Sequence, residues 1–165
     1  MAKIRTNRNP VAKATFEALG FDEEHRHVCE IEDLKEHIED GQCDAGESVY
    51  SRIYPLNQNE ITKSVLDTQH SLFLTAMIMR NDFWEKLSPE VKAVIKDAAI
   101  KAGRKERETT IMDGEEAKQK LLAEGIEVHE PSAEEKQEMK EKTKVVYEKF
   151  KDTFTPGLVD RIKKA

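Results

Sequence analysis

The sequence has little of what usually assigns a chain to a class at once. It contains two cysteines, one tryptophan and no run of about 18 apolar residues, the length that a membrane-spanning helix requires. Its first residues include no apolar signal region, so the sequence as written predicts no export signal. We find no Gly-rich phosphate loop, serine nucleophile elbow or paired-carboxylate motif, and therefore expect no enzymatic activity.

The two cysteines leave the redox compartment open. Cys29 and Cys43 can form at most one disulfide, which fits an oxidising compartment without requiring one. Two free, buried thiols are at least as good an expectation.

The charge balance excludes nucleic acid as a main partner. The chain has 27 basic and 33 acidic residues and a net charge of -6. Binding to phosphates needs clustered lysine and arginine, whereas the basic residues here alternate with acidic ones, as in residues 92–108. Such interleaving is typical of a solvated helix face.

Short apolar stretches alternate with helical patterns through the first half and predict an α/β fold. Asn9 and Pro10 begin a helix as its N-cap and first residue, and Gly20 ends it. A second helix is expected over residues 31–41, and a turn or short helix over residues 49–56. Strands are expected over residues 3–6, 25–30, 43–48, 61–68 and, as a buried apolar strand, 73–79.

The second half is predicted to be mainly helical. Ser88 and Pro89 begin a helix whose apolar pattern can continue to Gly125, with a bend or break expected near Gly103 or Gly114. A short strand is expected at residues 126–129. Ser132-Ala-Glu-Glu135 is a capping box that opens another helix, and Pro156-Gly157 precedes a last turn.

The order and spacing of three segments resemble one transport family. Lys3-Ile-Arg-Thr6 is followed by a helix ending in Phe16-Glu-Ala-Leu-Gly20, then by the turn Gly41-Gln-Cys-Asp-Ala-Gly-Glu47 and by Phe83-Trp-Glu-Lys-Leu-Ser-Pro-Glu90. Together they resemble the solute receptors of tripartite ATP-independent periplasmic (TRAP) transporters, over residues 3 to about 155. Two features depart from the family: the chain has about half the usual length, and residues 21–28 are longer and more charged than the equivalent linker.

The resemblance implies a periplasmic-binding-protein-like second lobe with long C-terminal helices and an incomplete first lobe. Residues 1–72 would form the α/β core of the second lobe. Residues 73–125 would supply a strand and a long connecting helix to the first lobe of a full receptor, and residues 126–165 would pack back.

The resemblance also implies a ligand site. In this family an arginine on the first strand of the second lobe pairs with the carboxylate of an organic acid, and Arg5 matches that position. A guanidinium suits this role because its planar donors match two carboxylate oxygens and it stays charged. Ser48 matches a polar position that reaches the ligand, and a serine in a turn that bonds its own backbone is an equally good interpretation. Glu47 is interpreted as part of the turn or hinge, because an unpaired anion would repel a bound carboxylate.

Three further residues are weaker candidates for lining the cleft. Ile31 matches a position that is often apolar or aromatic, and Tyr50 and His70 are the other two. For each of them, simple packing with the polar atoms satisfied is an equal or better interpretation.

We therefore expect a non-catalytic, periplasmic receptor, or a piece of one, that binds a small organic acid without a cofactor and delivers it to TRAP membrane subunits. The alternative is an interaction module derived from that scaffold. In that case the apolar surface left by the missing lobe, around residues 73–79 and 91–102, would drive homodimerisation or a domain swap.

Histidine and cysteine at every second position suggest a metal site without establishing it. His25, His27 and Cys29 would share one face of a strand, and Cys43 could add a fourth zinc ligand. Nothing in the sequence places Cys43 beside them, and the usual zinc spacings are absent. The preferred interpretation is a polar strand edge with buried thiols and no metal; the same reasoning rejects Cys29 with a nearby histidine as a catalytic pair.

Overall fold

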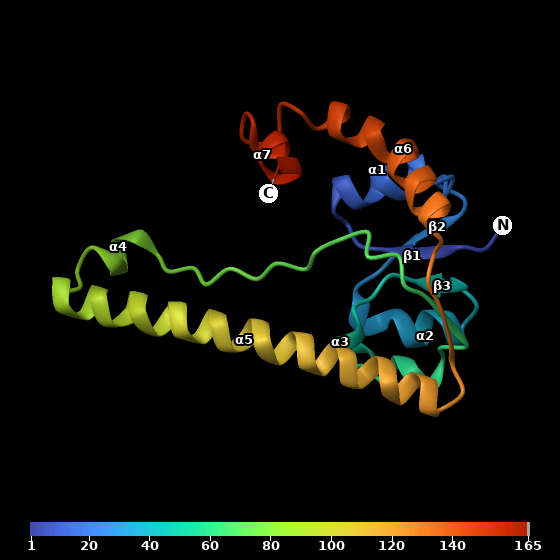
Figure 1. The fold of residues 1–165 in the computed structure, drawn as a ribbon, viewed down its shortest axis with the longest axis horizontal. Coiled ribbons are helices and arrows are strands. Elements are labelled where there is room, and N and C mark those ends of the chain that lie inside the picture. Colours follow the sequence, from blue (N-terminus) through green and yellow to red (C-terminus); the bar gives the residue numbers. More distant parts are fainter. Residues whose placement is uncertain (165) are drawn as a thin grey trace.

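The computed structural model describes residues 1–164 and contains two small parallel sheets connected by helices. Figure 1 shows the first sheet among the helices. The elements follow in the order β1 (Ile4–Thr6), α1 (Pro10–Ala18), β2 (Arg26–Val28), η1 (Ile31–Asp33), α2 (Leu34–Glu39), β3 (Ala45–Gly46), α3 (Tyr50–Ile53), η2 (Gln58–Glu60), β4 (Ser64–Leu66), α4 (Asn81–Trp84), α5 (Pro89–Ala123), β5 (Glu127–His129), α6 (Ala133–Lys149) and α7 (Leu158–Lys164). The mixed α/β class is confirmed.

The first sheet has the order β2-β1-β3, and both pairs are parallel. Arg5 on the central strand is in register with His27 on one side and Gly46 on the other. The chain therefore moves first to one side of β1 and then across it to the other. Helices α1 and α2 lie on opposite sides of this sheet, as expected for a doubly wound arrangement (Figure 1).

Local signals determine where α1 begins, and its buried face attaches it to the neighbouring elements. The Asn9 side chain accepts a hydrogen bond from the Val11 amide, and Pro10 occupies the first turn. Ala14 and Phe16 are buried. Helix α6 contacts α1, so the C-terminal part of the chain covers the N-terminal helix.

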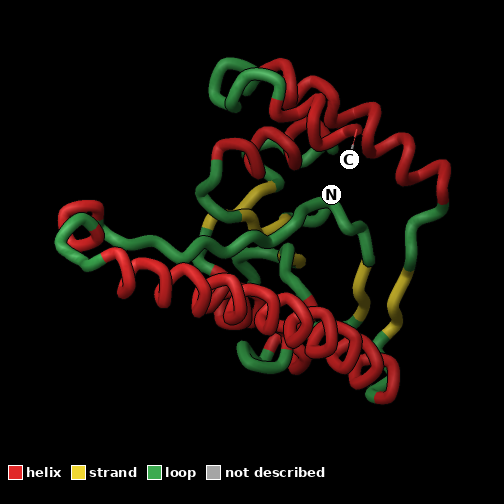
Figure 2. Tube along the Cα trace, turned by 60° about the vertical axis from the view of Figure 1, so that its left-hand side comes forward, coloured by secondary structure: helices red, strands yellow, loops and turns green. Residues whose placement is uncertain are grey.

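The second sheet pairs β4 and β5 in parallel, with α5 between them in sequence and beside them in space (Figure 2). The ammonium of Lys118 on α5 bonds Asp67 at 3.1 Å and Glu130 at 2.9 Å, just beyond the ends of β4 and β5. These two hydrogen bonds raise the pKa of Lys118 and keep it charged. One lysine thus joins the helix to both strands.

Two helix starts confirm the sequence prediction. Ser88 accepts from the Val91 amide at 3.4 Å at the start of α5, and Ser132 and Glu135 form the complete capping box of α6. The expected break is absent, because α5 is a single helix through Gly103 and Gly114. A helical glycine lowers stability by about 1 kcal/mol without forcing a break.

The expected buried strand at residues 73–79 is also wrong in this structure. The segment forms no strand and runs as an extended arm (residues 69–80) beside α5 toward α4 (Figure 1). Its apolar side chains are exposed, with Leu72 at 79% and Ile78 at 93%. The reason is physical: an apolar run becomes a buried strand only where partner strands and a covering layer meet it, and residues 1–164 supply neither.

Cys29 and Cys43 are free and buried. Among the described residues, no helix combines the length and the apolar character needed to cross a membrane.

The packing of α2 on the first sheet yields a stability prediction. A Cβ atom at Gly46 would lie 2.7 and 2.8 Å from the two methyl carbons of Leu34, which is itself 4% exposed. Gly46→Ala should therefore lower the free energy of unfolding by about 1–3 kcal/mol, because the buried leucine must move. Urea unfolding followed by circular dichroism measures the change.

The matched control is Gly103→Ala on α5, where an added Cβ meets nothing within 4 Å. It should raise stability by about 0.5–1 kcal/mol, as replacement of a helical glycine does. Equal effects of the two substitutions would contradict the packing explanation.

Candidate functional site

The candidate site lies at the carboxyl ends of β1, β2 and β3. In doubly wound sheets, ligands bind outside these ends where the connections diverge to opposite faces. Here the divergence occurs between β1 and β3, so the segments after Thr6 and after Gly46 border it. Arg5, Glu47 and Ser48 belong to these two strands or directly follow them.

Arg5 is buried on the central strand. It is 4% exposed, and its Nε donates a hydrogen bond of 2.8 Å to the Cys29 carbonyl. Within residues 1–164 its guanidinium forms no ion pair with a carboxylate. Arg8, in contrast, is exposed and pairs with Glu30 at 3.4 Å. The structure thus holds one nearly buried, uncompensated positive charge at the carboxyl edge of the sheet.

Glu47 bridges two segments that border this edge. Its carboxylate accepts from the Asn7 amide at 3.0 Å and contacts His70 Nε2 at 3.2 Å. His70 also bonds the Thr68 hydroxyl at 2.7 Å and packs edge-on against Phe16 at 5.7 Å. Glu47 and His70 therefore fasten the end of β1 to the start of the arm.

Ser48 and Ile31 meet through Gln58, a buried residue of η2. The Ser48 hydroxyl donates to the Gln58 side-chain oxygen at 2.7 Å, and the Gln58 amide donates to the Ile31 carbonyl at 3.4 Å. In this arrangement the hydroxyl hydrogen of Ser48 is engaged within the protein. Its remaining capacity toward a ligand is that of an acceptor.

Tyr50 lies elsewhere, in the contact between α3 and α5. It borders a hollow of about 210 Å³ that Tyr54, Asp113 and Lys120 also line, and Arg5 does not line it. Its ring lies 6.0 Å from the Lys118 ammonium. Tyr50 thus holds two helices together, whereas Arg5, Ile31, Glu47, Ser48 and His70 gather around the ends of the strands.

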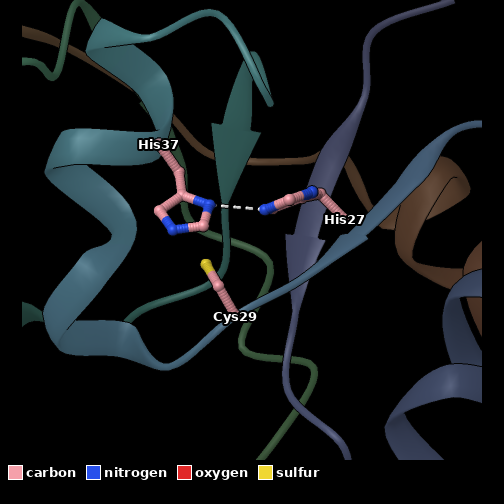
Figure 3. A group of neighbouring side chains, drawn as sticks. All are labelled: His27, Cys29 and His37. Atoms are coloured by element: carbon pink, nitrogen blue, oxygen red, sulfur yellow. Dashed lines mark hydrogen bonds between the residues drawn. The ribbon is translucent and has the colours of Figure 1, made fainter.

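A second cluster lies beneath α2, on the Arg5 side of the sheet. Donor atoms of His27, Cys29 and His37 all lie within 4.8 Å of one another (Figure 3). Burial lowers the pKa of His27, and the nearby His37 and Lys3 lower it further. Burial also raises the pKa of the Cys29 thiol, while the Arg5 guanidinium acts against that increase.

Sequence reasoning missed three residues of this region: Asn7, His37 and Gln58. Each contacts a residue that is distant in the sequence: Asn7 contacts Glu47, His37 contacts His27, and Gln58 contacts Ser48. No local sequence pattern marks any of the three. The alternation of His27 and Cys29 was visible in the sequence, but His25 does not join them, because it lies 2.7 Å from Asp22 outside the sheet. His37 joins them only because α2 crosses that face.

The comparisons with known proteins decide the family. The profile of bacterial extracellular solute-binding proteins, family 7 (DctP), matches residues 2–153. This chain belongs to that family. The family consists of periplasmic, substrate-binding transport proteins, which are not enzymes, so the resemblance to TRAP solute receptors is confirmed.

Individual relatives agree with the assignment. The ectoine-binding periplasmic protein TeaA of Halomonas elongata is 32% identical over 151 residues, which cover 90% of this chain and 43% of the relative. The crystal structure of that ectoine-binding protein has a TM-score of 0.83, with 28% identity over 92% of this chain and 49% of its own.

A TRAP periplasmic solute-binding protein from Fusobacterium nucleatum, with bound sn-glycerol-3-phosphate, also has a TM-score of 0.83. It is 26% identical over 99% of this chain and 51% of its own. The chain thus spans about half the length of the relatives it matches.

The environment of Tyr50 yields a prediction on pH. Burial, followed by the negative charge of Asp67, raises the pKa of Tyr50 to about 12 from an ordinary value of 10.0. Between these two values the folded protein holds a proton that the unfolded chain has lost. Stability should therefore fall as the pH rises from about 10 to 12.

Urea unfolding at several pH values in that range measures the slope. Tyr50→Phe should flatten it, while Tyr147→Phe, at an exposed position on α6, should leave it unchanged. An unchanged slope in Tyr50→Phe would show that another group causes the loss.

Proposed function

We propose that this chain is the C-terminal half of a periplasmic solute receptor of the TRAP type, and that Arg5 binds the carboxylate of a small organic acid. In the complete receptor the ligand would lie between this lobe and a first lobe. Closure of the lobes would couple binding to recognition by the membrane subunits.

The observation that carries the proposal is the uncompensated burial of Arg5. A buried ion without a partner destabilises a fold by roughly several kcal/mol. In residues 1–164 the guanidinium has one hydrogen bond to a carbonyl and no ion pair. A carboxylate at the carboxyl edge of β1 would supply the missing charge with a bidentate geometry. The bound sn-glycerol-3-phosphate of the Fusobacterium relative is likewise an anion.

The surrounding network fits a scaffold that holds this edge in place. Glu47 is already engaged by Asn7 and His70, so its negative charge is directed into the protein and not presented freely to an anionic ligand. Gln58 holds Ser48 beside Ile31. We assign Glu47 and His70 to positioning. Ser48, as an acceptor for a donor group elsewhere on the ligand, and Ile31 stay candidates for ligand contact.

The arm and the start of α5 would meet the first lobe. They carry exposed apolar side chains, which in isolated proteins mark surfaces that another part covers. The members of this set are Leu72, Phe73, Leu74, Met77, Ile78, Val91 and Val94. Self-association through the same surface is the weaker alternative. The relatives in this receptor family are about twice as long as this chain, and their additional lobe would cover the surface instead.

Arg5 is tested with a panel of organic acids, by thermal shift and calorimetry. With half a cleft, wild type should bind its acid only weakly, in the millimolar range that corresponds to about 4 kcal/mol. Arg5→Gln should weaken the affinity by roughly 10- to 150-fold, since hydrogen bonds to charged groups contribute about 1.5–3 kcal/mol. The matched control Arg8→Gln removes an exposed arginine three residues away and should bind as wild type does.

Two results would contradict the proposal. The first is an acid whose affinity survives in Arg5→Gln, which would locate the carboxylate elsewhere. The second is the absence of a shift with every acid combined with a concentration-dependent dimer in light scattering, which would favour self-association.

A further inference from the structure

The cluster of His27, Cys29 and His37 is a set of metal donors that the receptor function does not use. His27 belongs to β2, Cys29 follows that strand by one residue, and His37 is on α2. Figure 3 shows the imidazole of His37 facing that of His27, with the Cys29 sulfur beside the His37 ring. The three donors therefore come from two separate elements that the fold brings together.

We propose that His27, Cys29 and His37 bind a Zn²⁺ ion through two imidazole nitrogens and one thiolate, with a fourth position open to solvent or to an anion. Imidazole and thiolate are the ligands that zinc prefers, and zinc accepts three protein ligands with an open position.

The distances require small adjustments. Zinc binds nitrogen at about 2.0 Å and sulfur at about 2.3 Å, which puts the donor atoms of a tetrahedral site roughly 3.3–3.6 Å apart. His27 Nε2 and His37 Nδ1 are 2.5 Å apart, and no donor pair exceeds 4.8 Å. The two nitrogens must separate by about 0.8 Å, and the sulfur must lie at about 3.5 Å from each of them. Side-chain rotation can supply this, because both histidines are only half-buried.

The proton balance is simple. The hydrogen bond between the imidazoles needs a proton on one of the two facing nitrogens, and zinc needs both of them free. That proton can move to the other nitrogen of the same ring. Neither His27 Nδ1 nor His37 Nε2 bonds to another group within residues 1–164, so either can hold it. The Cys29 thiol loses its proton to solvent as the zinc–sulfur bond forms.

The charges near the site are mixed. Asp33 and Glu30 place negative charge near Cys29, whereas Arg5 and Lys3 place positive charge near the cluster. A thiolate reduces the added charge of Zn²⁺ from two to one. Cys43 is buried nearby but lies outside the three-residue set, so we assign it no bond to the ion.

The test uses the metal alone, so its outcome does not depend on the organic acid. Metal-free chain, prepared under reducing conditions, is titrated with Zn²⁺ against a chromophoric chelator and, separately, with Co²⁺. Wild type should bind one equivalent with a dissociation constant on the order of micromolar or tighter, which is weaker than four-ligand structural sites. The Co²⁺ form should show thiolate-to-metal charge transfer and the visible bands of a four-coordinate ion.

Cys29→Ser and His37→Gln should each weaken the affinity at least about 100-fold, and Cys29→Ser should remove the charge-transfer band. The matched controls are His25→Gln and Cys43→Ser, which should bind as wild type does. Wild type itself supplies a readout without substitution: Zn²⁺ should protect Cys29 from alkylation, as mass spectrometry of the peptides shows.

Three outcomes would overturn the proposal. One is the absence of stoichiometric binding by folded wild type. Another is a Co²⁺ spectrum without thiolate charge transfer. The third is a loss of affinity in Cys43→Ser equal to that in Cys29→Ser, which would assign the ion to a two-cysteine site. Retained ligand binding by Arg5 in any of these cases would leave the receptor proposal intact.

Discussion

The first sheet is organised around the burial of Arg5, because a nearly buried guanidinium restricts everything that packs near it. Arg5 lies on the central strand, in register with His27 and Gly46. On the same side, α2 approaches so closely that Leu34 occupies the space where a side chain of residue 46 would begin. Arg5 and α2 thus lie on one side of the sheet, and the Arg5 guanidinium reaches the carbonyl of Cys29, which follows the end of β2.

The parts of the fold that the sequence predicted are those that depend on contacts within a few residues. The caps at Ser88 and Ser132 are side-chain bonds to amides three positions away, so they are visible in the sequence. Residues 73–79 show the opposite case. Their apolar pattern is that of a buried strand, but strand pairing depends on partners distant in the sequence, and within residues 1–164 the arm has none.

The candidate site was predictable to a similar extent. Family resemblance located Arg5 and the turn at Glu47, and the structure places both at the same edge of the sheet. Gln58 and His37 could not be predicted, because the fold brings them against residues ten positions away in the sequence. Gln58 on η2 contacts Ser48, and His37 on α2 contacts His27. Tyr50 was only a weak candidate for the cleft, and packing was its preferred interpretation; in the structure it lies between α3 and α5.

Cys29 connects the two proposals in physical terms. Its carbonyl accepts the hydrogen bond from Arg5, and its thiol belongs to the group formed with His27 and His37. An ion bound to the thiolate would fix the backbone of residue 29 and, through the carbonyl, the orientation of the guanidinium. It would also add positive charge on the Arg5 side of the sheet. Both effects act in the same direction, because a better oriented guanidinium and a more positive edge each favour an anionic ligand.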